Sequence, residues 1–518
     1  MDVKNKRVAI VGAGPSGLAA CKHALAKGFR PVVFESGAAV SGVWTRTLSS
    51  TTLQTPAAAF RFSDFPWPAE LAPEPEQSFP RHDEVAAYMT AYARRFGVLD
   101  CVRFRSKVLA AEYVGPPERE VAAWERWSWN GEAFGDGSGE WQLTVQHAGE
   151  SEGTQTYRFD FLVLCVGRYG VAKVPTFPEG RGPEVFHGRV LHSMDYSRMA
   201  HADADELIRG KRVVVVGSGK SGLDTVAQCA KINGSKNPCT LIYRSNHWMV
   251  DAKLIWGGIS FGKLAMTRLS EMMVHKPGEG FFLSLLATIF TPLRLLMATL
   301  VEAYYKTQIP LQKHGMVPEC SFSQSILGWR LGTLPERFYD MVNEGSIQLT
   351  KTTAFSFCAD GLVHDDGTGE RVVDADVVIL ATGFDADRLL SSVFVSPRFR
   401  EIIVQEGGWR TCSTAPCACP ASRPWSGAWR SGSGGVGGRS GKAAASSSSS
   451  RASAPSRRGT TISCPGTWGT ALGGRRGEGS SLSGCSRTDP RTTPASSKLS
   501  GVRKWVMSQV YFVILYNA

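Results

Sequence analysis

Residues Arg7–Gly17 read RVAIVGAGPSG, a short apolar run that ends in a glycine-rich turn. A helix-like stretch follows from Leu18 to Lys27, and a second apolar run, Pro31–Phe34, ends at Glu35. The order of strand, glycine turn, helix, strand and acid is typical of the βαβ unit that binds a dinucleotide. A GxGxxG pattern alone is a weak signal, but here the flanking segments agree with it.

Each glycine of this first turn has a predicted task. We expect Gly12 to allow the tight turn, Gly14 to let the backbone approach a pyrophosphate, and Gly17 to let the helix pack close to the strand. The unpaired N–H groups at the start of the helix would bind the pyrophosphate, and Glu35 would accept hydrogen bonds from ribose hydroxyls. The residues predicted to bind a nucleotide with a free ribose, FAD or NAD, are Gly12, Ala13, Gly14, Pro15, Ser16, Gly17 and Glu35.

The same pattern occurs a second time. Val213–Val216 leads into the turn GSGKSG, Leu223–Ala230 has helical character, and the next predicted strand, Thr240–Tyr243, ends in Arg244 rather than in an acid. An acid at that place would repel a 2′-phosphate, whereas arginine, with Lys220 of the turn, would pair with one. A solvated charge at a strand end is the alternative reading of Arg244. The residues predicted to bind NADP are Gly217, Ser218, Gly219, Lys220, Ser221, Gly222 and Arg244.

Two further apolar runs end in a glycine, Phe161–Gly167 and Val377–Gly383, and both are typical of buried parallel strands. We therefore predict an α/β protein with two Rossmann-like domains, in which the last strand returns to the first domain. On this prediction a discontinuous FAD-binding domain contains an inserted NADPH-binding domain. The expected boundaries are 1–170 and 331–408 for the two parts of the FAD-binding domain and 171–330 for the NADPH-binding domain.

The positive charge of the chain is concentrated near its C-terminal end. The net charge is +12, yet residues 410–518 hold 15 Lys and Arg against two acids, whereas residues 1–409 hold 43 basic and 44 acidic side chains. The same segment contains 22 Ser. Such a segment cannot bury enough apolar surface to offset its chain entropy, so we predict a low-complexity, disordered basic tail over 409–518.

Composition disfavours several classes of protein. Basic residues confined to such a tail do not form the basic, aromatic-lined face that nucleic-acid binding requires, so no nucleic-acid partner is expected. The seven cysteines of residues 1–409 include no CxxC pair, which argues against a metal site and against a redox dithiol. The first apolar run leads directly into the glycine turn and cannot be a cleaved leader, which favours a cytoplasmic location.

A long apolar run extends from Phe281 to Val301 and contains Pro292 and Arg294. A central arginine is unfavourable inside a bilayer, so we interpret the run as a buried helix pair or as a wall of a substrate channel. Peripheral association with the endoplasmic reticulum membrane is the alternative.

A third motif lies between the two turns. Residues Phe186–Tyr196 read FHGRVLHSMDY, which places Phe186, Gly188, His192 and Tyr196 at the spacing FxGxxxHxxxY. This spacing resembles the fingerprint of the flavin-containing monooxygenases. The other motifs that fall in the order of that family, over residues 5–405, are the two turns, Ser41–Trp44, Phe62–Pro66 and Ala381–Phe384. Leu53–Thr55 and Phe65–Pro68 are most similar to the plant branch.

The resemblance implies both cofactors and a reaction. NADPH would reduce FAD, O₂ would form a C4a-hydroperoxyflavin, and an amine nitrogen or sulfide sulfur would take one oxygen atom, with no catalytic acid or base required. The resemblance also assigns Gly42, Val43, Trp44, Thr55, Thr382 and Gly383 to the FAD site. Animal members place an asparagine beside the threonine that touches flavin and nicotinamide. Here Gln54 stands in that place, and its catalytic role is a hypothesis.

The chain departs from the family in two other regions. A Trp-rich stretch with Trp124, Trp127, Trp129 and Trp141 is interpreted as a packed β insertion. Beyond residue 408 the family continues with an ordered segment that closes the FAD-binding domain, and none of it is recognisable here. Thr411–Pro416, read one base later, could encode a Leu-Tyr-Arg of the family, so we predict a shifted-frame or mis-spliced tail, with a genuine basic extension as the rival.

Two other functions stay open at this point. One is the decarboxylating, auxin-biosynthetic type of plant flavin monooxygenase, and the other is an inactive product that lacks the closing segment. A disulfide reductase is disfavoured by the lack of a CxxC pair, and a Baeyer–Villiger oxygenase by Tyr196, where its fingerprint has tryptophan. The substrate and the oligomeric state are not predicted.

Overall fold

The computed structural model describes residues 5–74, 78–115, 139–148, 153–250, 272–275, 279–327, 331–365 and 369–406. The predicted tail over 409–518, with Thr411–Pro416, lies outside the described residues. The same holds for Trp124, Trp127 and Trp129.

The first sheet contains the first turn. It is parallel and has the strand order β3-β2-β1-β7. Its strands are β1 (Arg7–Val11), β2 (Arg30–Phe34), β3 (Val102–Arg103) and β7 (Phe161–Leu164), and it is accompanied by α1 (Pro15–Ala26) and α3 (His82–Arg95). In β1, Ile10 packs in the cluster that contains the α1 and α3 side chains, and Ala9 packs in the opposite cluster. Both are fully buried, as expected for a parallel strand covered on both faces.

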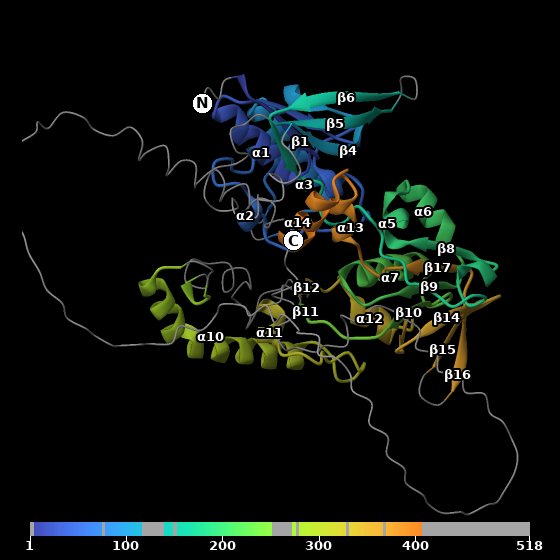
Figure 1. The fold of residues 1–518 in the computed structure, drawn as a ribbon. Helices are drawn as coiled ribbons and strands as arrows, with labels where there is room; N and C mark the ends of the chain where they lie inside the picture. Colours follow the sequence, from blue (N-terminus) through green and yellow to red (C-terminus); the bar gives the residue numbers. More distant parts are fainter. Residues whose placement is uncertain are drawn as a thin grey trace, which may run out of the picture. The chain divides into compact units, whose positions relative to one another are not determined.

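An antiparallel sheet covers the second face of the first domain. It consists of β4 (Ser106–Val114), β5 (Glu140–His147) and β6 (Thr154–Phe159). The helices α13 (Ala386–Ser391) and α14 (Pro397–Glu406) return to this region, where orange and blue elements meet in Figure 1. The N–H of Ala111 donates to the Val393 carbonyl at 2.7 Å, and the N–H of Val395 donates to the Ala111 carbonyl at 3.1 Å. Trp141, Phe394 and Phe399 pack in the same cluster, which confirms Trp141 as part of a packed β insertion.

The second sheet contains the second turn. It is parallel and has the order β13-β10-β9-β17-β8. The strands are β8 (Arg189–His192), β9 (Val213–Val216), β10 (Cys239–Tyr243), β13 (Ile347–Lys351) and β17 (Val377–Leu380). The helix after the turn is α7 (Lys220–Asn233). The predicted α/β fold with two Rossmann-like domains is confirmed.

The predicted return of the last strand to the first domain is wrong. β17 pairs with β9 and β8, and β13 pairs with β10, so both strands belong to the second sheet although 331–408 was assigned to the FAD-binding domain. The reason is that β9, four buried valines, needs a partner on each side, and β17 supplies one of them. The chain returns to the first domain only with α13, so the inserted domain extends to about residue 385.

The remaining elements complete both domains and the connections between them. A three-stranded antiparallel sheet packs against the second sheet, and Phe186 lies in the apolar cluster between them. Its strands are β14 (Phe355–Cys358), β15 (Gly361–Asp365) and β16 (Glu370–Asp374). The other elements are η2 (Gly42–Thr45), α2 (Ala57–Phe60), η3 (Ala69–Leu71), η4 (Leu99–Cys101), η6 (Pro183–Val185), α5 (Ser193–Arg198), α6 (His201–Ile208), β11 (Met249–Val250), α10 (Phe281–Gln308), α11 (Phe322–Leu327), β12 (Gly332–Thr333) and α12 (Phe338–Asn343).

The apolar run Phe281–Val301 forms one helix, α10, which continues through Pro292. Most of its large apolar side chains are exposed, with Phe281 at 76%, Phe282 at 83% and Ile289 at 62%. The interpretation as a buried helix pair is therefore wrong, because apolar composition does not tell a covered helix from an uncovered one. Among the described residues, α10 is the one helix long and apolar enough to cross a membrane, and length and composition alone do not place it in one.

The two connections between the domains run side by side. One leads from β7 to β8 and the other from β17 to α13, and Ala172 pairs with Phe384 in antiparallel fashion. The Lys173 N–H donates to the Gly383 carbonyl at 3.0 Å, and the Asp385 N–H donates to the Val171 carbonyl at 2.9 Å. We call these paired segments, 171–173 and 382–385, the crossing ribbon.

Candidate functional site

The first turn requires glycine at its first and third glycine positions. Gly12 has a φ of +101°, and a Cβ there would lie 2.4 Å from the Cys165 carbonyl oxygen. A Cβ on Gly17 would lie 1.9 Å from the Gly12 carbonyl oxygen, so α1 can begin this close to the turn only with glycine there. The nearest atom to a Cβ on Gly14 is 3.8 Å away, which leaves its backbone accessible to a ligand. The tight turn at Gly12 and the close packing at Gly17 are as predicted, and the approach of a pyrophosphate at Gly14 stays a prediction.

The second turn repeats this geometry in the second sheet. Gly217 has a φ of +119°, and its Cβ would lie 2.4 Å from the Ala381 carbonyl oxygen, while that of Gly222 would lie 1.8 Å from the Gly217 carbonyl oxygen. A Cβ on Gly219 would have no protein atom within 4 Å. The hydrogen bonds correspond as well, since the Gly12 N–H donates to Phe34 and the Gly217 N–H to Ile242, both at 2.8 Å. The two turns are thus equivalent sites at the carboxyl ends of two parallel sheets.

Glu35 is held against the first turn. Its side chain is buried, Oε2 accepts the Ala13 N–H at 2.8 Å, and Oε1 accepts the Gly37 N–H at 2.7 Å. The Ser36 hydroxyl also donates to Oε1, at 3.3 Å, whereas Oε2 has a further lone pair with which to accept a ribose hydroxyl. The structure therefore brings Glu35 and the turn together, as predicted.

The loop with Gly42, Val43 and Trp44 also lies at the first turn. The N–H of Ser41, a residue with a φ of +91°, donates to the Ala13 carbonyl at 2.9 Å. A Cβ on Gly42 would lie 3.2 Å from the Gly14 Cα, so the loop contacts the turn through glycine backbone. The Trp44 ring packs edge-on against Phe60. This agrees with the flavin-side position that the resemblance implies.

Thr382 and Gly383 are not at the first turn. They follow β17 directly, and Ala381, which precedes them, contacts Gly217 of the second turn. The Thr382 hydroxyl donates to the Lys173 carbonyl at 2.6 Å within the crossing ribbon. Both residues thus lie in the connection between the domains, and their assignment to the FAD site stays a prediction.

The charged residues of the second site lie at one edge of the second sheet. By register, Tyr243 takes the place that Glu35 has in the first site, and Arg244 follows it, half-buried, with burial lowering the pKa of its guanidinium. The Ser218 hydroxyl donates to the Ser245 carbonyl at 2.6 Å and so joins the turn to this segment. Lys220 is already paired, with its Nζ 2.6 Å from Asp224 Oδ1. Sequence reasoning missed Asp224, although its spacing of four residues from Lys220 in a helix was a readable signal.

Gln54 and Thr55 lie on a segment that connects the two domains. The Gln54 Oε1 accepts the Thr333 N–H of β12 at 3.1 Å, which leaves the amide N–H₂ for other partners. Upstream, Leu48 packs in the core of the second domain, and the Ser50 hydroxyl donates to Gln228 of α7 at 3.0 Å. The segment from Ser41, which contacts the first turn, to Thr55 thus also contacts α7, the helix that follows the second turn.

Comparison with known proteins identifies the family. The family model "Flavin-binding monooxygenase-like" matches residues 5–287. The chain is 34% identical over 400 residues to "Probable flavin-containing monooxygenase 1" of Arabidopsis thaliana, which covers 76% of this chain and 72% of that protein. The chain belongs to the flavin-binding monooxygenase-like family.

Other relatives agree with this membership. "Putative flavin-containing monooxygenase 2" of Arabidopsis thaliana is 32% identical over 76% of this chain and 75% of that protein. "Flavin-containing monooxygenase 5" of Oryctolagus cuniculus is 26% identical over 73% of this chain and 62% of that protein. The predicted plant branch is thus supported, and the prediction of an FAD- and NADPH-dependent monooxygenase is confirmed.

Solved structures show the same fold at lower sequence identity. A crystal structure of OTEMO in complex with FAD and NADP (form 4) matches with a TM-score of 0.51 and 20% identity. The match covers 77% of this chain and 75% of the OTEMO chain. An ε-caprolactone-bound cyclohexanone monooxygenase has a TM-score of 0.51 and 18% identity, with 78% of each chain covered.

The family fingerprint of this monooxygenase supports the second sheet. A Cβ on Gly188 would lie 2.4 Å from the Asp376 carbonyl oxygen, and Phe186 and Tyr196 are buried in core clusters. His192 Nδ1 accepts the Met194 N–H at 3.1 Å and so caps α5. Burial lowers the pKa of His192 and raises that of Tyr196, so both are neutral near pH 7. The buried fingerprint residues thus stabilise the junction between β8 and α5 through packing and helix capping.

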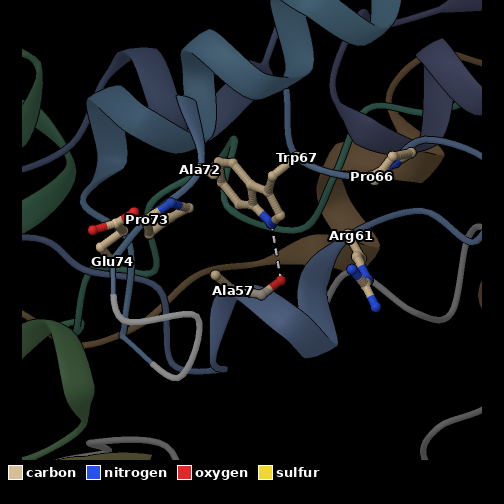
Figure 2. A pocket seen from close by; sticks show the side chains of 7 residues that line it. All are labelled: Ala57, Arg61, Pro66, Trp67, Ala72, Pro73 and Glu74. Carbon is tan, nitrogen blue, oxygen red and sulfur yellow. Dashed lines mark hydrogen bonds between the residues drawn. The ribbon is translucent and has the colours of Figure 1, made fainter. Parts of the chain in front are cut away.

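A pocket lies directly downstream of Thr55. Its volume is about 740 Å³, and Figure 2 shows the side chains around it, which are Ala57, Arg61, Pro66, Trp67, Ala72, Pro73 and Glu74. The indole N–H of Trp67 donates to the Ala57 carbonyl at 2.9 Å, which fixes the ring. The volume falls in the range of small-molecule pockets. The sequence showed the Phe65–Pro68 motif but gave no sign of a pocket beside it.

Proposed function

We propose that this monooxygenase binds FAD at the first turn and NADPH at the second, and that it inserts one oxygen atom from O₂ into an amine nitrogen or a sulfide sulfur. The observation that carries the proposal is the pair of equivalent turns with opposite charges beside them. Glu35 stands at the first turn, and Arg244 and Lys220 stand at the second. A carboxylate accepts ribose hydroxyls, whereas arginine and lysine favour the 2′-phosphate of NADP.

The glycine geometry fits both cofactors. At Gly14 and Gly219 the space beside the backbone holds no protein atom closer than 3.8 Å, so a pyrophosphate can approach the N–H groups that begin α1 and α7. Bound FAD, reduced by NADPH, supplies the oxygen-activating chemistry. The chain's own residues bind and orient: Glu35 fixes the adenosine, and the loop at Gly42 covers the turn. We assign the free amide end of Gln54 to the space between flavin and nicotinamide.

The pocket beside Thr55 is our candidate for the substrate side. It begins two residues after Thr55, and its apolar lining by Trp67 and prolines suits an uncharged amine or sulfide carried on an apolar group. The charged residues Arg61 and Glu74 are exposed.

Isotope labelling tests the proposed reaction. We expect the purified full chain, with NADPH and ¹⁸O₂, to convert N,N-dimethylaniline or an alkyl aryl sulfide to its oxide with one ¹⁸O atom, measured by mass spectrometry. One NADPH should be consumed for each product molecule, with water and NADP⁺ formed. Release of CO₂ from an α-keto acid without N- or S-oxide would support the decarboxylating alternative. Protein that purifies without flavin would support the inactive product.

Coenzyme choice gives a second test. Arg244→Ser should raise the KM for NADPH about 10- to 100-fold and leave that for NADH nearly unchanged, because a charge-assisted hydrogen bond to phosphate contributes about 1.5–3 kcal/mol. Initial rates of oxidation of the two coenzymes measure this. Arg209→Ser, at an exposed arginine of the same domain, is the matched control. An equal loss with both coenzymes would contradict a role at the 2′-phosphate.

A further inference from the structure

The lysine of the second turn is held by a carboxylate of its own helix. Lys220 is the first residue of α7, and its Nζ lies 2.6 Å from Oδ1 of Asp224, one helical turn further on. The side chains are only 23% and 13% exposed. A short, partly buried ion pair of this kind is stronger than one on the open surface, because water screens it less.

Asp224 has little else to compensate its charge. Burial raises the pKa of its carboxyl, and the ammonium of Lys220, followed by that of Lys231, opposes this rise. Further along the same face, the Gln228 amide is engaged with Ser50, in the segment that leads to the flavin side. Lys220 is therefore the main partner that keeps Asp224 ionised, and Asp224 in turn draws the ammonium toward itself.

A phosphate group that arrives at this turn meets the ion pair instead of a free ammonium. It has to share Lys220 with Asp224 or displace the carboxylate from the ammonium. We infer that Asp224 weakens the binding of NADP(H) at the second turn by competing with the coenzyme phosphates for Lys220. The inference rests on the proposed assignment of NADPH to this turn and adds an affinity-setting residue to it.

This competition would help the release of the oxidised coenzyme, which must leave the second turn after each catalytic cycle. The turn, the N-terminus of α7, Lys220 and Arg244 all favour an anion, and such a set alone would hold the oxidised coenzyme tightly. A carboxylate that takes Lys220 back when the phosphate leaves speeds dissociation. Asp224 acts through Lys220 and touches no reacting atom, so it is a positioning residue.

Calorimetric titration of the flavin-loaded full chain with NADP⁺ tests the inference. Asp224→Asn keeps the shape and removes the charge, and we expect it to lower the Kd about five- to tenfold, in line with an ion pair of about 1 kcal/mol. Lys220→Met should raise the Kd, and adding Asp224→Asn to Lys220→Met should change it less than about twofold. Asp224→Glu should stay near the wild type. Glu206→Gln, at an exposed acid of α6, controls for the change in net charge.

Steady-state kinetics supply an independent readout. Asp224→Asn should lower the KM for NADPH and strengthen inhibition by NADP⁺, and thermal unfolding should confirm that the variant is folded. Weaker or unchanged NADP⁺ binding in folded Asp224→Asn would overturn the inference, since it would mean that the carboxylate only orients Lys220. If wild-type protein with bound flavin fails to bind NADP⁺ at all, the proposed coenzyme site itself fails, so the two failures are distinguishable.

Discussion

Replacement of Gly17 by alanine should yield protein without flavin, whereas replacement of Gly222 should leave flavin bound and abolish its reduction by NADPH. The added Cβ would lie 1.9 Å from the Gly12 carbonyl oxygen in the first case and 1.8 Å from that of Gly217 in the second. Backbone oxygens cannot rotate away, so α1 or α7 must move off its turn. The flavin absorbance per chain and the rate of anaerobic flavin reduction measure the two outcomes.

The strength of this pair is that both substitutions impose the same clash in two equivalent turns. Any difference between them reports which nucleotide each turn binds. Gly219→Ala is the control, because a Cβ there would have no protein atom within 4 Å. It should fold with its flavin and lose only coenzyme affinity. A colourless Gly222→Ala protein beside a yellow Gly17→Ala protein would reverse the assignment of the two sites.

The second large effect is expected at Trp141. Trp141→Ala should lower the free energy of unfolding by about 3–5 kcal/mol, the usual range for removing a buried tryptophan. The side chain is 4% exposed, and its ring lies 5.1 Å from that of Phe399, 5.2 Å from that of Tyr113 and 5.8 Å from that of Phe394. It therefore attaches α14 and the segment before it to the antiparallel sheet.

Chemical denaturation measures this loss, and limited proteolysis shows whether the α13–α14 segment detaches first. Leu109→Ala is the matched control, because Leu109 is on the same sheet but 38% exposed, and it should change stability by less than about 1 kcal/mol. A Trp141→Ala protein as stable as the control would mean that the return of the chain is held by other contacts.

The two βαβ units were predictable because their signals are local. The glycine spacing, the β-branched strands and the terminal Glu35 and Arg244 lie within about 35 residues of each other, and the structure places the first-turn residues together as expected. The sheet of β17 was not predictable. β7 and β17 are both short apolar strands that end near a glycine, and nothing within either strand says which sheet receives it. Partner choice there depends on contacts with residues more than 150 positions away.

The site residues were predictable only where the type of a side chain indicates a single kind of ligand. Arg244 and Lys220 indicated a phosphate, but the ion pair of Lys220 with Asp224 changes what that lysine offers. The exposure of α10 and the pocket beside Trp67 depend on how separate segments pack, and composition does not contain that information. The role of the fingerprint was similarly hidden, since His192 and Tyr196 lie in the interior of the second domain.

The crossing ribbon has a mechanical consequence. Two separate linkers would let the domains rotate relative to each other. The two segments of the crossing ribbon are instead joined by backbone hydrogen bonds, which restrict this rotation. Each segment of the crossing ribbon follows a residue that lies against a nucleotide turn. Cys165, before segment 171–173, lies against Gly12, and Ala381, before segment 382–385, lies against Gly217. Main-chain atoms of the crossing ribbon therefore help to set the spacing between the two nucleotide turns, because backbone geometry does not change when side chains are exchanged.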